Sequence, residues 1–192
     1  ARYTPAYAAP LATWQAAARP LGVRRGVLVQ TSFLGTDNRL LLSTLAQHPE
    51  TLRGVAVVAP TANADTLARL PAPLPLVIDH LGKPETMAAG DATVRALATR
   101  ARQAPVHVKL SGAYRLGGLD AGALARLWLG ELGLDRLLWG SDWPCTNHEA
   151  HADYPALHHA LDDWLLDRAA VEAARVDNPN RLYWGSGTGS AG

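Results

Sequence analysis

A chain of 192 residues, 48% hydrophobic and 18% charged, is long enough to form a folded core and too apolar to be intrinsically disordered. Its formal net charge of +1 gives no electrostatic reason to expect nucleic acid or an anionic membrane as a partner. No apolar stretch approaches the roughly 20 residues that span a bilayer, and the single cysteine excludes an internal disulfide, so we expect a cytoplasmic protein.

Strand and helix patterns alternate along the chain. Short continuous apolar runs predict strands at residues 25–30, 54–58, 76–79, 106–110 and 136–139. Helical patterns are predicted from Asp37 or Asn38 to His48, and at residues 65–70, 93–102, 119–132 and 154–176. This alternation is typical of an α/β protein with parallel βαβ units and a sheet that is covered on both faces.

The ends of the sequence carry their own expectations. Ala1 is neither an initiator methionine nor part of a signal peptide, so we expect a chain that is processed, trimmed or incomplete. Residues 1–184 are predicted to form a single domain. The glycine-rich and serine-rich residues 185–192 are typical of a flexible tail or linker.

Each of the last three predicted strands ends in polar side chains. These are Asp79, His80, Lys83, Lys109, Ser111, Tyr114, Arg115 and Asp142. Because the carboxyl ends of parallel strands meet at one edge of a sheet, we expect Asp142, His80 and Arg115 to face one pocket. A carboxylate or imidazole that takes a proton from water, beside cations that hold a developing oxyanion, suits hydrolysis.

Each of these residues also has a structural interpretation. Asp142 could cap a turn, His80 could bond a backbone carbonyl, and Arg115 could be a solvated loop residue. These interpretations do not predict that three strands all end in this way, so the joint arrangement favours a site.

The remaining histidines and the cysteine give weaker signals. His107 lies within a predicted strand and is interpreted as structural. The spacing of His148, His151, His158 and His159 does not fit a zinc motif and favours surface or rim positions. No paired base marks Cys145 as a nucleophile.

Six segments resemble the amidohydrolase-2 family. Residues 2–5 and 27–38 resemble the segments before and at its second strand. Residues 77–84, 108–112 and 138–144 resemble the ends of its sixth, seventh and eighth strands, and residues 177–183 resemble its C-terminal signature. Within the family, the similarity is to 2-pyrone-4,6-dicarboxylate lactonases and related sugar-lactone and muconolactone hydrolases. The resemblance implies a (β/α)₈ TIM barrel and hydrolysis of a small acidic or sugar-derived lactone.

The resemblance also implies roles for particular residues. Asp142 would be the general base with His80 beside it, and the substrate would be bound by Tyr3, Lys83, Arg115 and Trp143. Lys83 stands where the pyrone-dicarboxylate enzymes carry arginine.

If the chain is a lactone hydrolase of this kind, we expect that it requires no cofactor. In the alternative, Asp142 and His80 would hold one divalent metal such as zinc or manganese. The expected partner is a small-molecule lactone, with no nucleic acid and no membrane, and self-association into a homo-oligomer is left open.

The family pattern is incomplete in this sequence. This sequence has no counterpart of the family's first strand, which carries the His-x-His motif, or of its fourth and fifth strands. At Leu70–Pro71 the sequence passes directly from the helix that follows the family's third strand to its sixth strand. We expect that residues of the whole protein are missing from the sequence at this point, and that the Cα atoms of Leu70 and Pro71 are therefore far apart. Two alternatives remain: a metal-dependent hydrolase or decarboxylase of the same family, and a non-catalytic remnant with a structural or binding role.

Overall fold

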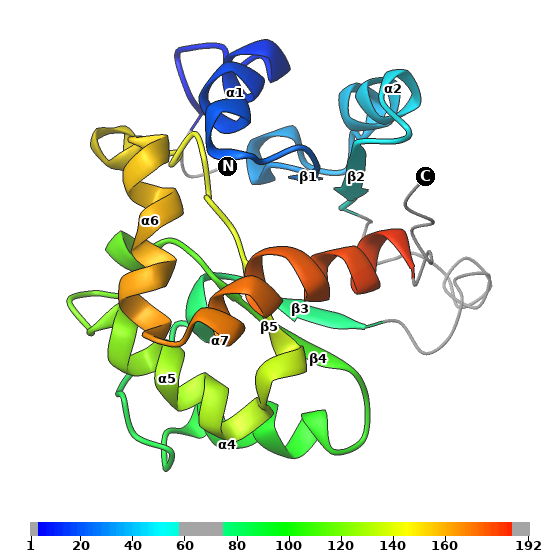
Figure 1. The fold of residues 1–192 in the computed structure, drawn as a ribbon. Helices are drawn as coiled ribbons and strands as arrows, with labels where there is room; N and C mark the ends of the chain where they lie inside the picture. The colour runs from blue at the N-terminus through cyan, green and yellow to red at the C-terminus, as the bar shows by residue number, and fades with distance from the viewer. Residues whose placement is uncertain (1–3, 58–74, 186–192) are drawn as a thin grey trace. The chain divides into compact units, whose positions relative to one another are not determined.

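The structure, a computed structural model, describes residues 4–57 and 75–185. The chain divides into two compact units, Ala1–Ala72 and Pro73–Gly192, and each is described by itself. Figure 1 shows the elements of both units along the chain. None of the helices in the described ranges is long and apolar enough to cross a membrane.

Within residues 4–57, the first unit contains two α-helices and a parallel pair of strands. Its elements are α1 (Leu11–Ala18), β1 (Gly26–Val29), α2 (Arg39–Gln47) and β2 (Leu52–Val55). The strand expected at 25–30 and the helix expected to end near 48 are confirmed. The strand expected at 54–58 instead begins at Leu52, which is buried. Helix α1 was not expected. Its apolar residues form no clear stripe along one helical face, and a proline lies on each side of the helix.

The second unit is built on a three-stranded parallel sheet. Its strands are β3 (Leu76–Ile78), β4 (Val106–Leu110) and β5 (Leu137–Trp139), in the order β3-β4-β5. Val108 lies opposite Ile78 on one side and Leu137 on the other. The three predicted strands and their parallel pairing are therefore confirmed, and their carboxyl ends share one edge.

Aspartates begin the helices of the second unit. The helices are α4 (Ala92–Ala101), α5 (Ala121–Leu132), α6 (Tyr154–Leu165) and α7 (Arg168–Glu172), followed by helical turns at Ala173–Asp177 and Asn180–Trp184. The side chain of an aspartate accepts backbone N–H bonds at the start of each helix, from Asp91, Asp120, Asp153 and Asp167. The single helix expected over 154–176 is interrupted, because Leu166 adopts φ 57° and Asp167 starts a new helix.

The core of the second unit lies between the sheet and its helices. Trp128 and Leu124 of α5 pack with Val108 and Leu110 of β4 and with Leu161 of α6, and all are fully buried. The rim position expected for His158 is wrong. This residue is buried on the α6 face that also carries Tyr154, Leu161 and Leu165, and its ring meets the edge of Trp139.

The fold is α/β, but the closed eight-stranded barrel is not seen. The described residues contain two partial sheets with five strands in all, which cannot close a (β/α)₈ barrel. The helix expected at 65–70, the Leu70–Pro71 junction and residues 186–192 lie outside the described residues. The single domain over 1–184 and the flexible tail stay predictions.

Candidate active site

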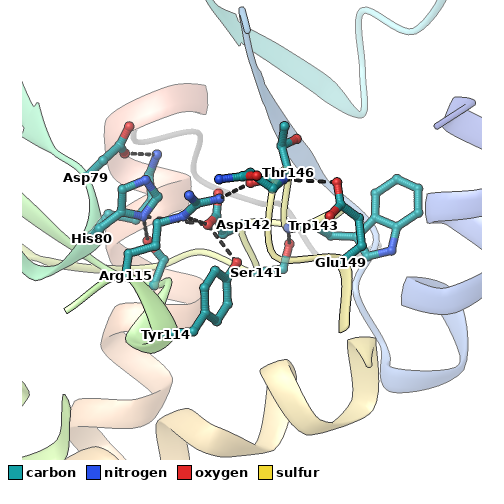
Figure 2. Close-up of polar contacts among 12 residues, drawn as sticks. Asp79, His80, Tyr114, Arg115, Ser141, Asp142, Trp143, Thr146 and Glu149 are labelled. Atoms are coloured by element: carbon teal, nitrogen blue, oxygen red, sulfur yellow. Dashed lines mark hydrogen bonds and ion pairs between the residues drawn. The ribbon is translucent and has the colours of Figure 1, made fainter. Parts of the chain in front are cut away.

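The candidate site lies at the carboxyl edge of the three-stranded sheet. The loops after β3, β4 and β5 carry His80, Arg115 and Asp142 respectively. His80 and Asp142 both have positive φ angles, 52° and 55°, so their backbones turn sharply as they leave the strands. The distances below bring these three side chains together at one sheet edge, and Figure 2 shows them converging. That they face one pocket stays a prediction.

The carboxylate of Asp142 is the centre of the cluster. Its Oδ2 accepts a hydrogen bond of 2.7 Å from the Tyr114 hydroxyl and one of 2.6 Å from Arg115 Nε. Both donors come from one short helical turn, Ala113–Arg115, directly after β4. Within residues 75–185, Oδ1 of Asp142 has no hydrogen-bond donor. One carboxylate oxygen is therefore fully engaged while the other is left for a further ligand.

His80 lies beside this carboxylate without bonding to it. Its Nδ1 is 3.1 Å from Ser111 Oγ and 3.8 Å from Asp142 Oδ2. Burial lowers the pKa of His80, and the charge of Arg115 adds to this, although the nearby carboxylates oppose it. We therefore expect a neutral imidazole at pH 7.

Gly112 makes room for the three side chains to converge. Its φ of +61° is unfavourable for other residues. A Cβ on Gly112 would lie 2.8 Å from His80 Nδ1 and 3.2 Å from Asp142 Oδ2. The site is therefore assembled around a glycine, and a side chain there would collide with His80 and crowd Asp142.

A second ion pair, in addition to that between Arg115 and Asp142, joins two of the strand ends. Lys109 of β4 donates to Asp79, the residue that follows β3. The stem of Lys109 runs across Gly140, where a Cβ would lie 2.6 Å from its Cδ. Because each charge of this pair is met by the other, Lys109 and Asp79 connect two strand ends rather than adding a free charge.

Tyr114 was named among the polar strand-end residues but was not expected to take part in the site. Its ring stacks on His151 with centroids 4.7 Å apart and an interplanar angle of 12°, and it also contacts His148 at 5.1 Å. These contacts agree with the rim positions expected for the two histidines. A tyrosine directly before the candidate arginine is the sequence signal that could have indicated this role.

The other predicted substrate-binding residues are not brought to the carboxylate. Tyr3 lies outside the described residues. Lys83 is exposed, and its side chain makes no hydrogen bond or ion pair with any residue of the described part of the chain. Trp143 is half-buried, and in Figure 2 its side chain extends away from His80 and Arg115. Their binding roles stay predictions.

Cys145 is fully buried near the cluster. Burial raises the pKa of its thiol, with the Asp142 carboxylate adding to the effect. Such a thiol stays protonated at neutral pH, so its surroundings do not activate it as a nucleophile.

The residues of the site do not fit a metal ion as they stand. In the ranges 4–57 and 75–185, no three His, Cys, Asp or Glu side chains gather in a group that could hold one. Of the two candidate ligands, Asp142 receives a guanidinium and a phenol on Oδ2. A cation at this oxygen would have to displace the positive charge of Arg115. We therefore derive no step through a metal.

Comparison with known proteins confirms the resemblance seen in the sequence. The sequence profile of the amidohydrolase family matches residues 59–184. A 4-sulfomuconolactone hydrolase of Rhizobium radiobacter is 35% identical over 118 residues, which cover 57% of this chain and 39% of that protein. A 2-pyrone-4,6-dicarboxylate hydrolase of Comamonas testosteroni is 29% identical over 128 residues, covering 58% and 42%. The chain thus spans about two fifths of the length of these relatives.

Solved structures support the same relationship. A protein of Pseudomonas putida that is assigned as a 2-pyrone-4,6-dicarboxylic acid hydrolase superimposes with a TM-score of 0.81 and 28% identity, over 96% of this chain and 91% of that one. A protein of Acinetobacter baumannii with the same assignment, crystallised with citric acid bound, gives a TM-score of 0.81 and 26% identity over 95% and 91%.

Proposed function

The chain belongs to the amidohydrolase family, and from that premise we propose that it hydrolyses a small lactone that bears an acidic group. Asp142 is the general base of this reaction, His80 and Arg115 stabilise charge, and Lys83 contributes to binding the acidic group.

The observation that carries the proposal is the unequal use of the two Asp142 oxygens. Oδ2 holds both Tyr114 and Arg115, while Oδ1 has no donor among residues 75–185. A carboxylate fixed through one oxygen presents the other in a defined direction. A water molecule bonded to Oδ1 would be positioned to lose a proton as it attacks a carbonyl carbon.

The bond changes of the reaction then follow. Asp142 Oδ1 takes a proton from water while the water oxygen forms a bond to the lactone carbonyl carbon, and the carbonyl oxygen becomes an oxyanion. When the carbonyl re-forms, the bond between this carbon and the ring oxygen breaks. The ring oxygen receives the proton from Asp142, which gives the open-chain acid and restores the carboxylate.

His80 is suited to the carbonyl oxygen of the substrate. When the Ser111 hydroxyl donates to Nδ1 at 3.1 Å, the neutral ring carries its proton on Nε2. That N–H is then available to the developing oxyanion. A neutral N–H can donate a hydrogen bond to the oxyanion without adding a second positive charge beside Arg115.

An acidic substrate is supported by charge and by the relatives. Arg115 uses Nε on Asp142 and one N–H of Nη2 on the Thr146 carbonyl, and its other N–H groups have no acceptor in the described second unit. Lys83 is an additional exposed cation. The substrates that name the relatives, 4-sulfomuconolactone and 2-pyrone-4,6-dicarboxylate, are acidic lactones, and one solved relative holds citric acid.

The proposal is tested with matched pairs of acidic and neutral lactones. Hydrolysis of 2-pyrone-4,6-dicarboxylate and of its dimethyl ester is followed by loss of the pyrone absorbance, and 4-sulfomuconolactone is assayed beside them. We expect the acids to be hydrolysed and kcat/KM for the ester to be lower by ~10-fold or more, since the ester cannot pair with Arg115 and Lys83.

Two results would contradict the proposal. Equal kcat/KM for acid and ester would show that the acidic group is not recognised. Binding of the acids, measured by calorimetry, without any hydrolysis would favour the non-catalytic alternative.

A further inference from the structure

Tyr114 is bonded to the candidate base yet has no evident place in the bond changes of hydrolysis. We infer that Tyr114 is a positioning residue that pins the Asp142 loop to the turn after β4 and so directs Oδ1 toward the attacking water. This inference rests on the proposed function, which supplies the task of Asp142.

The hydroxyl of Tyr114 is committed to Asp142. It lies 2.7 Å from Oδ2, on the same oxygen as Arg115 Nε. Burial raises the pKa of Tyr114, and its contacts with Cys145 and Asp142 add to this, so the hydroxyl keeps its proton over the working pH range. That proton is donated to a carboxylate oxygen and is not free for a substrate. Tyr114 therefore acts through Asp142.

The ring of Tyr114 is held by the same loop that carries Asp142. His151, nine residues after Asp142, stacks on the ring at 4.7 Å, and His148 lies against it at 5.1 Å. Tyr114 thus contacts the 140–153 loop at its hydroxyl and across its ring. Arg115 adds another contact, from Nη2 to the Thr146 carbonyl at 3.0 Å. Two adjacent residues after β4 therefore fix the loop after β5 at several points.

Asp142 needs such support. Its φ of 55° is a conformation that residues with a side chain adopt at a cost, and it persists only where surrounding contacts impose it. Without the Tyr114 bond, Arg115 alone would hold Oδ2, and the carboxylate could rotate about its terminal bond. Fewer molecules would then present Oδ1 in the attacking geometry.

The test is a Tyr114→Phe variant, which keeps the ring and its stacking and removes only the hydroxyl. We expect kcat on the best lactone of the panel to fall ~10-fold, which corresponds to the loss of one hydrogen bond to a charged group, with KM within ~2-fold of the parent. Tyr154→Phe, at a buried tyrosine of the same unit, is the control and should retain the parental kcat.

A second pair of variants separates positioning from mere stability. His151→Ala leaves the hydroxyl in place but removes the stacked ring, so we expect kcat to fall while KM is unchanged. His151→Phe restores an aromatic face and should recover most of the parental kcat. A rise in KM with an unchanged kcat in Tyr114→Phe would mean that Tyr114 binds substrate, and would overturn the inference.

A spectroscopic measurement separates failure of this inference from failure of the proposed function. The ¹³C signal of the Asp142 carboxyl group, assigned by its loss in Asp142→Asn, should shift in Tyr114→Phe and stay in place in Tyr154→Phe. An unshifted signal in Tyr114→Phe would overturn the inference whatever the activity. If the parent hydrolyses no lactone of the panel, the proposed function fails even when the signal shifts.

Discussion

The indole of Trp128 donates a hydrogen bond of 2.8 Å from Nε1 to the carbonyl oxygen of Leu81, the residue that follows His80. Trp128 lies in the centre of the core on α5, and Leu81 is fully buried with φ 51°. The core thus holds the turn after β3 in a conformation that its backbone would not prefer. This bond therefore links the core to the turn that carries His80.

Replacing Trp128 with phenylalanine removes this bond and leaves a buried carbonyl without a donor. We expect the free energy of unfolding to fall by about 1–3 kcal/mol for the unsatisfied carbonyl, with a further loss from the smaller ring. Urea denaturation measures the change. Trp164→Phe is the comparison, since its half-buried ring packs at the edge of the same cluster, and it should cost less. Equal losses in the two variants would mean that the Leu81 bond contributes nothing of its own.

Gly112→Ala should damage both stability and activity. The new Cβ would be 2.8 Å from His80 Nδ1, and the positive φ of Gly112 adds a backbone cost of about 1–2 kcal/mol. We expect lower stability in urea denaturation and a fall in kcat, because His80 and Asp142 must move apart.

The matched control for this variant is Gly130→Ala in α5. A Cβ on Gly130 meets nothing within 4 Å, so this change should stabilise the helix by about 0.5–1 kcal/mol. A Gly112→Ala protein with parental kcat would show that the close approach of the three side chains is not needed for activity.

Much of the local structure could be predicted from the sequence, and the reasons are physical. The runs at 76–79 and 106–110 are apolar and bounded by turn residues, so the strands and their shared edge were predictable. Asp142, His80 and Arg115 were predicted to meet because parallel strands bring their ends together. The break between α6 and α7 at Leu166 could not be predicted, because a leucine gives no local signal for a left-handed backbone conformation.

The contacts made across loops could not be predicted in the same way. The Tyr114–Asp142 bond joins residues 28 positions apart through side-chain geometry that no periodicity encodes. His158 was expected at the surface or rim because the spacing of the histidines fits no zinc motif, but its helical spacing with Leu161 and Leu165 places it on the buried face of α6. The position of His158 relative to the apolar residues of α6 was the better guide there.

The pH dependence of stability should report on His107. Burial, with the charges of Arg136 and Arg181, lowers the pKa of His107 from 6.5 to about 4. Between these values the unfolded chain binds a proton that the folded protein does not, so stability is lost as the pH falls. We expect a loss of about 1–3 kcal/mol from pH 6.5 to pH 4 that is attributable to this residue.

Urea denaturation of His107→Gln across this pH range measures that contribution. The variant should lose less stability on acidification than the parent does. His159→Gln, a change at an exposed histidine, should follow the parental curve. Parallel curves for the parent and His107→Gln would contradict the neutral, buried state of His107.

The role of Lys83 is tested by its removal. If Lys83 binds the acidic group of the substrate, Lys83→Ala should raise KM for the dicarboxylate several-fold and leave kcat and the KM of the dimethyl ester nearly unchanged. Steady-state kinetics on the two substrates give both values. Equal effects on acid and ester would mean that Lys83 does not recognise the charge.

The most direct test of the account is the turnover of Asp142→Asn on an acidic lactone that the parent hydrolyses. The amide keeps the shape of the carboxylate but cannot take a proton from water, so we expect kcat to fall by at least ~10²-fold with the fold intact by circular dichroism. Asp135→Asn, at an exposed ion pair with Arg181, should retain parental kcat. Hydrolysis by Asp142→Asn at the parental rate would contradict the assignment of Asp142 as the base.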